Sequence, residues 1–237
     1  MIVDIHAHLV APAELYAYRA RLLATRGWGR GAAHGITDEK LRAAAESNIA
    51  LMDEVGTDVQ FLSPRPFHLM HSQRPGSIVR EWVSLNNDTI ARQVEMFPDR
   101  FAGVAALPQV PDEPPATWLD ELQRCVEEHG FVGCLLNPDP AEGAGTTPPM
   151  GDPWWYPVYQ KLVELDVPAL VHSAGCTNDR ESYSNHFITE EGIAIQSLLR
   201  GEVFELFPTL KLVIGHGGGP VPSQIGRGRA GSIRGRG

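Results

Sequence analysis

Cysteine is scarce in this sequence. Only three cysteines occur among the 237 residues, at Cys125, Cys134 and Cys176, and they are scattered and odd in number. Such a set cannot form the paired disulfide framework of a small secreted protein, and none of the three has the spacing of a zinc finger. The cysteine usage therefore predicts a protein of a reducing compartment, the cytoplasm.

Long apolar runs and basic residues are scarce as well. The sequence has no run of about 18 apolar residues, the length that spans a membrane, and its N-terminus lacks the basic and apolar segments of a secretory signal. Lysine and arginine number 20 against 29 aspartates and glutamates, which gives a formal net charge of −9. Because such a chain repels polyanionic surfaces, we expect neither a nucleic-acid partner nor a membrane partner.

The sequence does contain a regular alternation of two patterns. Short apolar runs, typical of parallel strands buried on both faces, alternate with longer segments of helical character. The predicted strands are residues 2–8, 58–63, 100–107, 131–137, 168–172 and 210–216. The predicted helices are residues 38–55, capped by Asp38, then 77–97, 114–128, 153–165 and 189–200, and the polar segment 10–37 is predicted as a loop.

Six strand-then-helix units predict an α/β fold, a TIM-type (β/α)8 barrel truncated after about six strands. An open doubly wound sheet is the alternative, but it would need a glycine-rich phosphate turn after the first strand, where residues 4–8 form none. The incomplete barrel is predicted to occupy residues 1–225. Residues 226–237 are rich in glycine and arginine without apolar periodicity, which predicts an irregular tail. An RNA-binding tail is disfavoured by its short length and the acidic body.

The first strand carries the first chemical signal. Side chains alternate between the two faces of a strand, so His6 and His8 point the same way. Two imidazoles on one face can both reach one metal ion, and imidazole suits zinc, copper, iron or nickel. The pattern predicts a metal site at the end of this strand.

Two later strands also end in histidine, His172 and His216. In a barrel the carboxyl ends of all strands meet at one rim, so these side chains are expected beside His6 and His8. A catalytic zinc keeps three protein ligands and an open position for water, a role that His6, His8 and His172 would fill. His216 could be a fourth metal contact, or a neutral base that shuttles protons beside the metal.

Two further strand ends carry candidate substrate contacts. Arg65 follows the second strand between Pro64 and Pro66, and a rigidly held guanidinium can grip a carboxylate through two hydrogen bonds. Asn137 ends the fourth strand, where its amide could hydrogen-bond a substrate.

Taken together, these segments resemble the amidohydrolase superfamily, in the amidohydrolase-related group that includes aminocarboxymuconate-semialdehyde decarboxylase and 4-oxalomesaconate hydratase. The shared motifs are Asp4-Ile5-His6-Ala7-His8, the fifth-strand His172 and His216-Gly217-Gly218-Gly219. Segments 61–65, 101–109, 136–140 and 155–157 are closer still to the hydratase. The resemblance covers about residues 1–225.

The resemblance implies a barrel of the metal-dependent hydrolase kind, with His6, His8 and His172 as ligands of a divalent metal, Zn²⁺ or alternatively Mn²⁺. It also implies Arg65 and Asn137 as substrate contacts. By the same resemblance His216 is a catalytic residue, the substrate is a small carboxylate from aromatic-ring degradation, and the protein is a homodimer.

Two departures accompany the resemblance. Members of the family carry a late Asp or Glu at the eighth strand, which lies beyond residue 237, and the hydratases have Gly-His-Tyr where Ala7-His8-Leu9 stands here. The function expected from the resemblance is hydration or decarboxylation of an unsaturated polycarboxylic acid. Hydrolysis of a C–N or C–C bond at the same site is an alternative, and an inactive truncated remnant is another.

Overall fold

The computed structural model describes residues 1–234. Its residues divide into two compact units. Unit 1 comprises residues 1–65, 73–108 and 120–134, and unit 2 comprises residues 66–72, 109–119 and 135–237. The single barrel domain over residues 1–225 stays a prediction.

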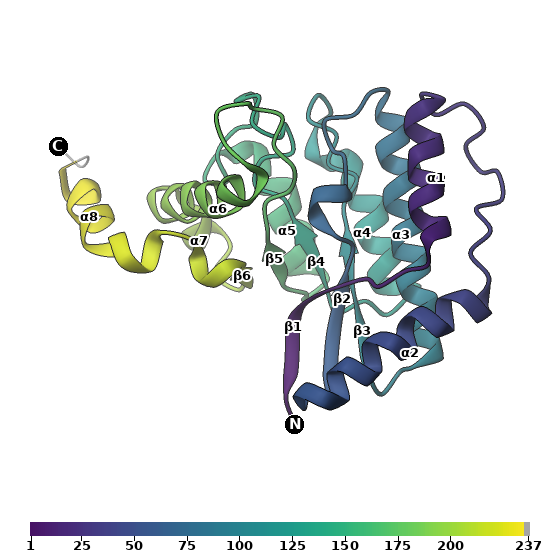
Figure 1. The fold of residues 1–237 in the computed structure, drawn as a ribbon. Helices are drawn as coiled ribbons and strands as arrows, with labels where there is room; N and C mark the ends of the chain where they lie inside the picture. The colour runs from purple at the N-terminus through teal and green to yellow at the C-terminus, as the bar shows by residue number, and fades with distance from the viewer. Residues whose placement is uncertain (235–237) are drawn as a thin grey trace. The chain divides into compact units, whose positions relative to one another are not determined.

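Six strands form one sheet, and neighbouring strands follow the order β1-β2-β3-β4-β5-β6 (Figure 1). Their bounds are Val3–His8 for β1, Val59–Ser63 for β2, Phe101–Ala106 for β3, Gly133–Leu136 for β4, Ala169–Val171 for β5 and Leu212–Ile214 for β6. The pairs β1–β2, β2–β3 and β5–β6 are parallel. Parallel strands in sequential order, with helices between them, confirm the predicted α/β class with the six units of a (β/α) barrel.

In unit 1, helices alternate with the strands of the sheet. The helices are α1 (Ala13–Ala24), α2 (Asp38–Val55), α3 (Gly76–Met96) and α4 (Leu119–Glu127). Helix α3 packs against β2 and β3 and also against α1 and α2 (Figure 1). The buried Asn87 of α3 pairs with the end of β3, since its amide donates to Ala106 O at 3.0 Å and its Oδ1 accepts from Ala106 N at 2.9 Å. This exchange holds β3 and α3 in register.

Helix α1 corrects the prediction of a loop over residues 10–37. Its buried side chains are Leu15, Tyr18 and Leu22, spaced three and four residues apart along one face of the helix. The Tyr18 hydroxyl also donates to Glu81 Oε1 at 2.5 Å. The apolar stripe is narrow, and the polar residues around it obscured the helical period.

The start of α2 corrects a second detail, because the cap is Thr37 and not Asp38. Thr37 Oγ1 accepts a hydrogen bond from Lys40 N at 3.3 Å, which satisfies one of the orphan donors of the first turn. Asp38 lies inside the first turn, where its negative charge favours the helix dipole.

Replacing this cap should weaken the fold measurably. We expect Thr37→Ala to lower the free energy of unfolding by about 1 kcal/mol, because the Lys40 amide loses its acceptor. Thr37→Ser keeps the hydroxyl and should cost only a few tenths of that value. Urea denaturation followed by circular dichroism measures both, and equal stability of the two variants would contradict the capping role.

Unit 2 is built from α5 (Tyr156–Glu164), α6 (Tyr183–Arg200), α7 (Val203–Leu206), α8 (Val221–Arg234) and the short 3₁₀ turns η1 (Pro66–His68), η2 (Pro115–Trp118), η3 (Pro153–Trp155) and η4 (His216–Gly218). Helix α5 packs against η2 and η3, and α6 packs against α7, α8 and η4. Trp118 and Trp155 are fully buried, with ring centroids 5.8 Å apart. The Trp155 indole N–H donates to Pro148 O at 2.9 Å, whereas the buried Nε1 of Trp118 has no hydrogen-bond partner.

Two boundaries in unit 2 differ from the prediction. Helix α6 begins at Tyr183 and not at residue 189, because Ser182 Oγ caps it by accepting from Asn185 N at 3.3 Å. Helix α8 extends to Arg234, although residues 226–237 were expected to be irregular. Helix α8 packs against α6 and η4, and this tertiary packing overrides glycine costs of about 1 kcal/mol each, while Pro222 lies in the first turn, where proline is tolerated. Residues 235–237 of the expected tail lie outside the described residues.

The structure also bears on two compositional predictions. Cys125 and Cys134 are fully buried core residues, and burial raises the pKa of the Cys134 thiol to about 12. Within residues 1–234, no helix combines the length and apolar character needed to cross a membrane.

Candidate functional site

The first half of the candidate site lies on β1. His6 and His8 are partly exposed, and the ring centroids are 5.3 Å apart in an edge-on arrangement. Ala7 between them is buried, as expected for a residue on the opposite face of the strand. The alternation of β1 therefore places both imidazoles on one side, as the His-x-His pattern predicted.

A neighbouring hydroxyl fixes the tautomer of His8. His8 Nδ1 lies 2.9 Å from Ser63 Oγ, and Ser63 Oγ donates its only hydrogen to Ala7 O at 3.2 Å. Ser63 must therefore accept from a protonated Nδ1, which leaves the lone pair on Nε2 of His8. Metal-binding histidines usually donate their other ring N–H in this way, which fixes the tautomer and the orientation of the ring.

The second half of the candidate site follows β5. His172 is 1% exposed, and its backbone N–H donates to Leu136 O of β4 at 3.0 Å. Its Nδ1 lies 2.5 Å from Ser173 O, a carbonyl that can only accept, so Nδ1 carries the hydrogen. The lone pair of His172 is therefore also on Nε2, and the buried imidazole is oriented by a backbone group.

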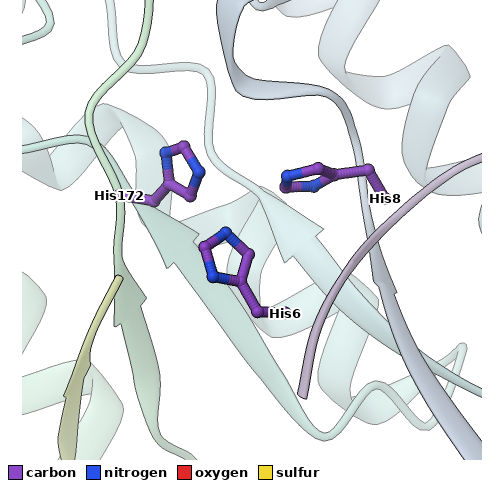
Figure 2. A group of neighbouring side chains, drawn as sticks. All are labelled: His6, His8 and His172. Atoms are coloured by element: carbon purple, nitrogen blue, oxygen red, sulfur yellow. The ribbon is translucent and has the colours of Figure 1, made fainter. Parts of the chain in front are cut away.

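Figure 2 draws the three histidines of the predicted metal site, His6 and His8 of β1 and His172 after β5. A catalytic zinc ion takes three such imidazole nitrogens and keeps a fourth position open. Three neutral imidazoles, two with assigned Nε2 lone pairs, fit a divalent metal of the zinc or manganese kind. Metal binding by these residues stays a prediction.

His216 lies at the start of η4, directly after β6. Its Nδ1 is 2.9 Å from Glu191 Oε1 and 3.1 Å from Glu191 Oε2. Its backbone φ is +47°, a left-handed conformation that costs a non-glycine residue about 1–3 kcal/mol and that clusters at functional sites. The buried carboxylate thus holds Nδ1 of His216 and fixes the orientation of the imidazole ring.

Glu191 is the residue that sequence reasoning missed. It is 0% exposed within α6, and burial raises the pKa of its carboxyl group while the contact with His216 acts in the opposite direction. A Cβ atom at position 215 would lie 3.0 Å from Glu191 Oε1, so Gly215 leaves the space that the carboxylate occupies. In the sequence Glu191 is one of two adjacent glutamates of a predicted helix, and nothing in that pattern shows which of them is buried.

Phe187 packs beside the two histidines of unit 2. The ring centroids of His172 and His216 lie 4.7 Å apart. Phe187 stacks on His216 at 5.6 Å with an interplanar angle of 14°, and its centroid lies 5.2 Å from that of His172. His172 is buried whereas His216 is exposed, so the imidazole of His216 is open to solvent while that of His172 is not.

The two predicted substrate contacts differ in environment. Arg65 is exposed, while Pro64 and Pro66 on either side are buried, so the backbone is anchored and the guanidinium faces solvent. Asn137 is buried, and its amide hydrogens are donated to His71 Nδ1 at 2.9 Å and Asp139 O at 3.1 Å. Asn137 Oδ1 accepts from Asp139 N at 3.0 Å, which leaves one lone pair for another contact.

Comparison with known proteins supports the fold and shows which proteins the chain is similar to. The amidohydrolase family model matches residues 3–232. The chain is 40% identical to 2-keto-4-carboxy-3-hexenedioate hydratase from Sphingobium sp. over 232 residues, which are 96% of this chain and 68% of the relative.

Two solved structures are similar over nearly the whole chain. The 4-oxalomesaconate hydratase from Rhodopseudomonas palustris superposes with a TM-score of 0.87 at 36% identity, covering 99% of this chain and 68% of that one. The dihydroxybenzoic acid decarboxylase from Polaromonas sp., with bound manganese and the inhibitor 2-nitroresorcinol, has a TM-score of 0.70 at 26% identity, covering 95% and 68%. The chain belongs to the amidohydrolase family.

Proposed function

We propose that this chain is a metal-dependent hydratase that adds water across a carbon–carbon double bond of a small unsaturated polycarboxylate from aromatic-compound degradation. The observation that carries the proposal is the 40% identity to a hydratase along 96% of the chain. The predicted set of three strand-end imidazoles supports it, because such a donor set suits the metal that a hydration would use. In the reaction the hydroxyl of water bonds to one alkene carbon and its proton to the other.

We also propose that His6, His8 and His172 hold the metal. Manganese in a relative supports a divalent ion, and three imidazole ligands favour Zn²⁺ as the native choice. When bound, the ion would supply Lewis acidity, which polarises a substrate oxygen and acidifies water.

The remaining roles belong to the side chains. Nε2 of His216 exchanges the proton of the reaction, with Glu191 holding Nδ1 on the other side of the ring. Arg65 binds a substrate carboxylate, and Asn137 offers its remaining Oδ1 lone pair to a substrate hydroxyl. Phe187 stacks on the imidazole of His216 and helps to hold the ring in place.

Decarboxylation is the second candidate function, supported by the similarity to a decarboxylase. The same metal ligands would then serve a reaction in which CO₂ leaves and the electron pair of the broken C–C bond is stabilised before protonation. His216 would deliver that proton, whereas no water would enter the product.

An assay of the purified chain, loaded with Mn²⁺ or Zn²⁺, separates the two. With 2-keto-4-carboxy-3-hexenedioate, hydration removes the conjugated double bond and its ultraviolet absorption, and NMR detects the new alcohol. With a dihydroxybenzoate, decarboxylation releases CO₂. Turnover of the first substrate and not the second supports the hydratase, and the reverse result replaces it with the decarboxylase.

Arg65 provides a test of substrate recognition. We expect Arg65→Lys to raise KM for the polycarboxylate about tenfold or more, because a lysine cannot make two parallel hydrogen bonds to one carboxylate. Steady-state kinetics should show a smaller change in kcat. The matched control is Arg26→Lys, at another exposed arginine of unit 1. An unchanged KM in Arg65→Lys would remove Arg65 from the binding site.

A further inference from the structure

A second group of metal-ligand side chains lies within unit 2. Asp139 follows β4, while His186 and Glu190 lie four residues apart on one face of α6. One ligand atom from each residue lies within 4.8 Å of the other two. None of the three was singled out as a metal ligand from the sequence.

The orientation of His186 is the central observation. Its side chain is 0% exposed, and Nδ1 lies 3.1 Å from Glu181 Oε1. Its Nε2 is buried without a hydrogen-bond partner and lies 3.5 Å from Asp139 Oδ2. A doubly protonated His186 would face Glu181 with one N–H and Asp139 with the other, and a cation at Nε2 would take the place of the second proton. A carboxylate that orients a histidine whose other nitrogen faces further donors is the usual outer shell of a metal ligand.

The charges around His186 favour a cation. Asp139 is 6% exposed, and Glu190 is partly buried. Among the described residues, those that line the adjoining cavity of about 290 Å³ include Asp139, Glu181 and Glu190 but no lysine or arginine. The three carboxylates are faced by a single imidazole, that of His186, so a divalent cation at this point would offset more of their charge than one protonated imidazole can.

We propose that Asp139, His186 and Glu190 form a second divalent-cation site, separate from the site proposed for His6, His8 and His172. The ligands are Nε2 of His186 and one oxygen from each carboxylate, a set that suits Zn²⁺, Mn²⁺ or Co²⁺. Glu181 orients His186, and the remaining coordination positions open to the cavity. The ion would tie the segment after β4 to α6, the helix that also carries Glu191.

A different set of ligands, which includes Cys176, is the alternative to this proposal. Cys176, Glu181 and His186 also offer ligand atoms within 4.8 Å of one another. In that arrangement the ion would bind Nδ1 of His186, in place of its hydrogen bond to Glu181. Co²⁺ distinguishes the two sets, because a thiolate ligand adds an intense near-ultraviolet charge-transfer band that nitrogen and oxygen ligands do not produce.

The test uses the full chain with His6→Ala and His8→Ala, which removes two ligands of the first proposed site. After chelator treatment, equilibrium dialysis against Co²⁺ should show about one bound ion per chain, without the thiolate band. Adding Glu190→Gln, or in a second variant Asp139→Asn, should weaken Co²⁺ binding about tenfold or more. The control Glu54→Gln changes an exposed glutamate of α2 and should leave binding unchanged.

Three outcomes would overturn the proposal. They are a folded double variant that binds no Co²⁺, full affinity in both Glu190→Gln and Asp139→Asn, and a thiolate band that assigns the ion to Cys176. Circular dichroism establishes folding in each case. Because the readout is bound Co²⁺ and not turnover, failure of the proposed hydratase activity would not affect the result.

Discussion

Alanine at both His6 and His8 is expected to lower the metal content of the purified chain by about one equivalent and to abolish its activity. Two of the three imidazoles in the proposed site are then lost, and the remaining His172 cannot hold a divalent ion alone. Metal activation contributes several kcal/mol to such reactions, so kcat/KM should fall about 10³-fold or more. Elemental analysis and steady-state kinetics measure the two effects.

The control for this variant is His34→Ala. His34 is a partly buried histidine of unit 1 whose Nδ1 accepts from Ile36 N at 3.1 Å, and it belongs to none of the candidate metal groups. It should keep both metal and activity. Unchanged metal content in the His6→Ala, His8→Ala variant, with the fold intact, would show that these residues do not bind the ion.

Removing the charge of Glu191 is expected to lower kcat about 10²-fold while KM changes little. The carboxylate holds Nδ1 of His216 through contacts of 2.9 and 3.1 Å, and Glu191→Gln replaces an acceptor by an amide that can present a donor instead. General acid–base groups contribute about 10²–10⁴-fold, and mispositioning one loses much of that factor. Because Glu191 acts through His216, it is a positioning residue.

The pH profile distinguishes positioning from structural damage. Burial raises the pKa of the Glu191 carboxyl group, and once protonated this group is no longer a charged acceptor for His216. The kcat of the wild type should therefore fall as the pH drops through that raised pKa, and this limb should be absent in Glu191→Gln, with metal content unchanged.

Two further variants sharpen the test of Glu191. Glu191→Asp, which keeps the charge, should recover part of kcat. The control Glu202→Gln, at an exposed glutamate near the end of α6, should behave as wild type. A loss of kcat without any change in the pH profile would contradict the positioning role.

The strands and the histidines at their ends were predictable from local pattern. Short apolar runs mark parallel strands wherever both faces are covered, and the run before His172 and the run before His216 are of this kind. The alternation of side chains along β1 then fixes the relation of His6 to His8 without any tertiary information.

The groups that surround these histidines were not predictable, because they depend on contacts between distant segments. Glu191 reaches His216 across 25 positions of sequence, and Asp139 meets His186 across 47. Helix α1 was hidden because only Leu15, Tyr18 and Leu22 face the core, and the early start of α6 concealed that His186 is helical. Asn137 was predicted as a substrate contact, but the sequence did not show that both of its amide hydrogens already take part in hydrogen bonds within the protein.

The hydrogen bonds at Nδ1 of His8 and His172 have a consequence for the proposed metal site. Ser63 holds one ring and the carbonyl of Ser173 holds the other, so both imidazoles would present the lone pair of Nε2 before any metal arrives. The ring of His8 is confined once β1 pairs with β2, and the ring of His172 is confined by its own neighbour in the chain. The entropy lost in ordering these two ligands therefore belongs to folding, and the binding energy of the ion appears as affinity instead of being used to organise them.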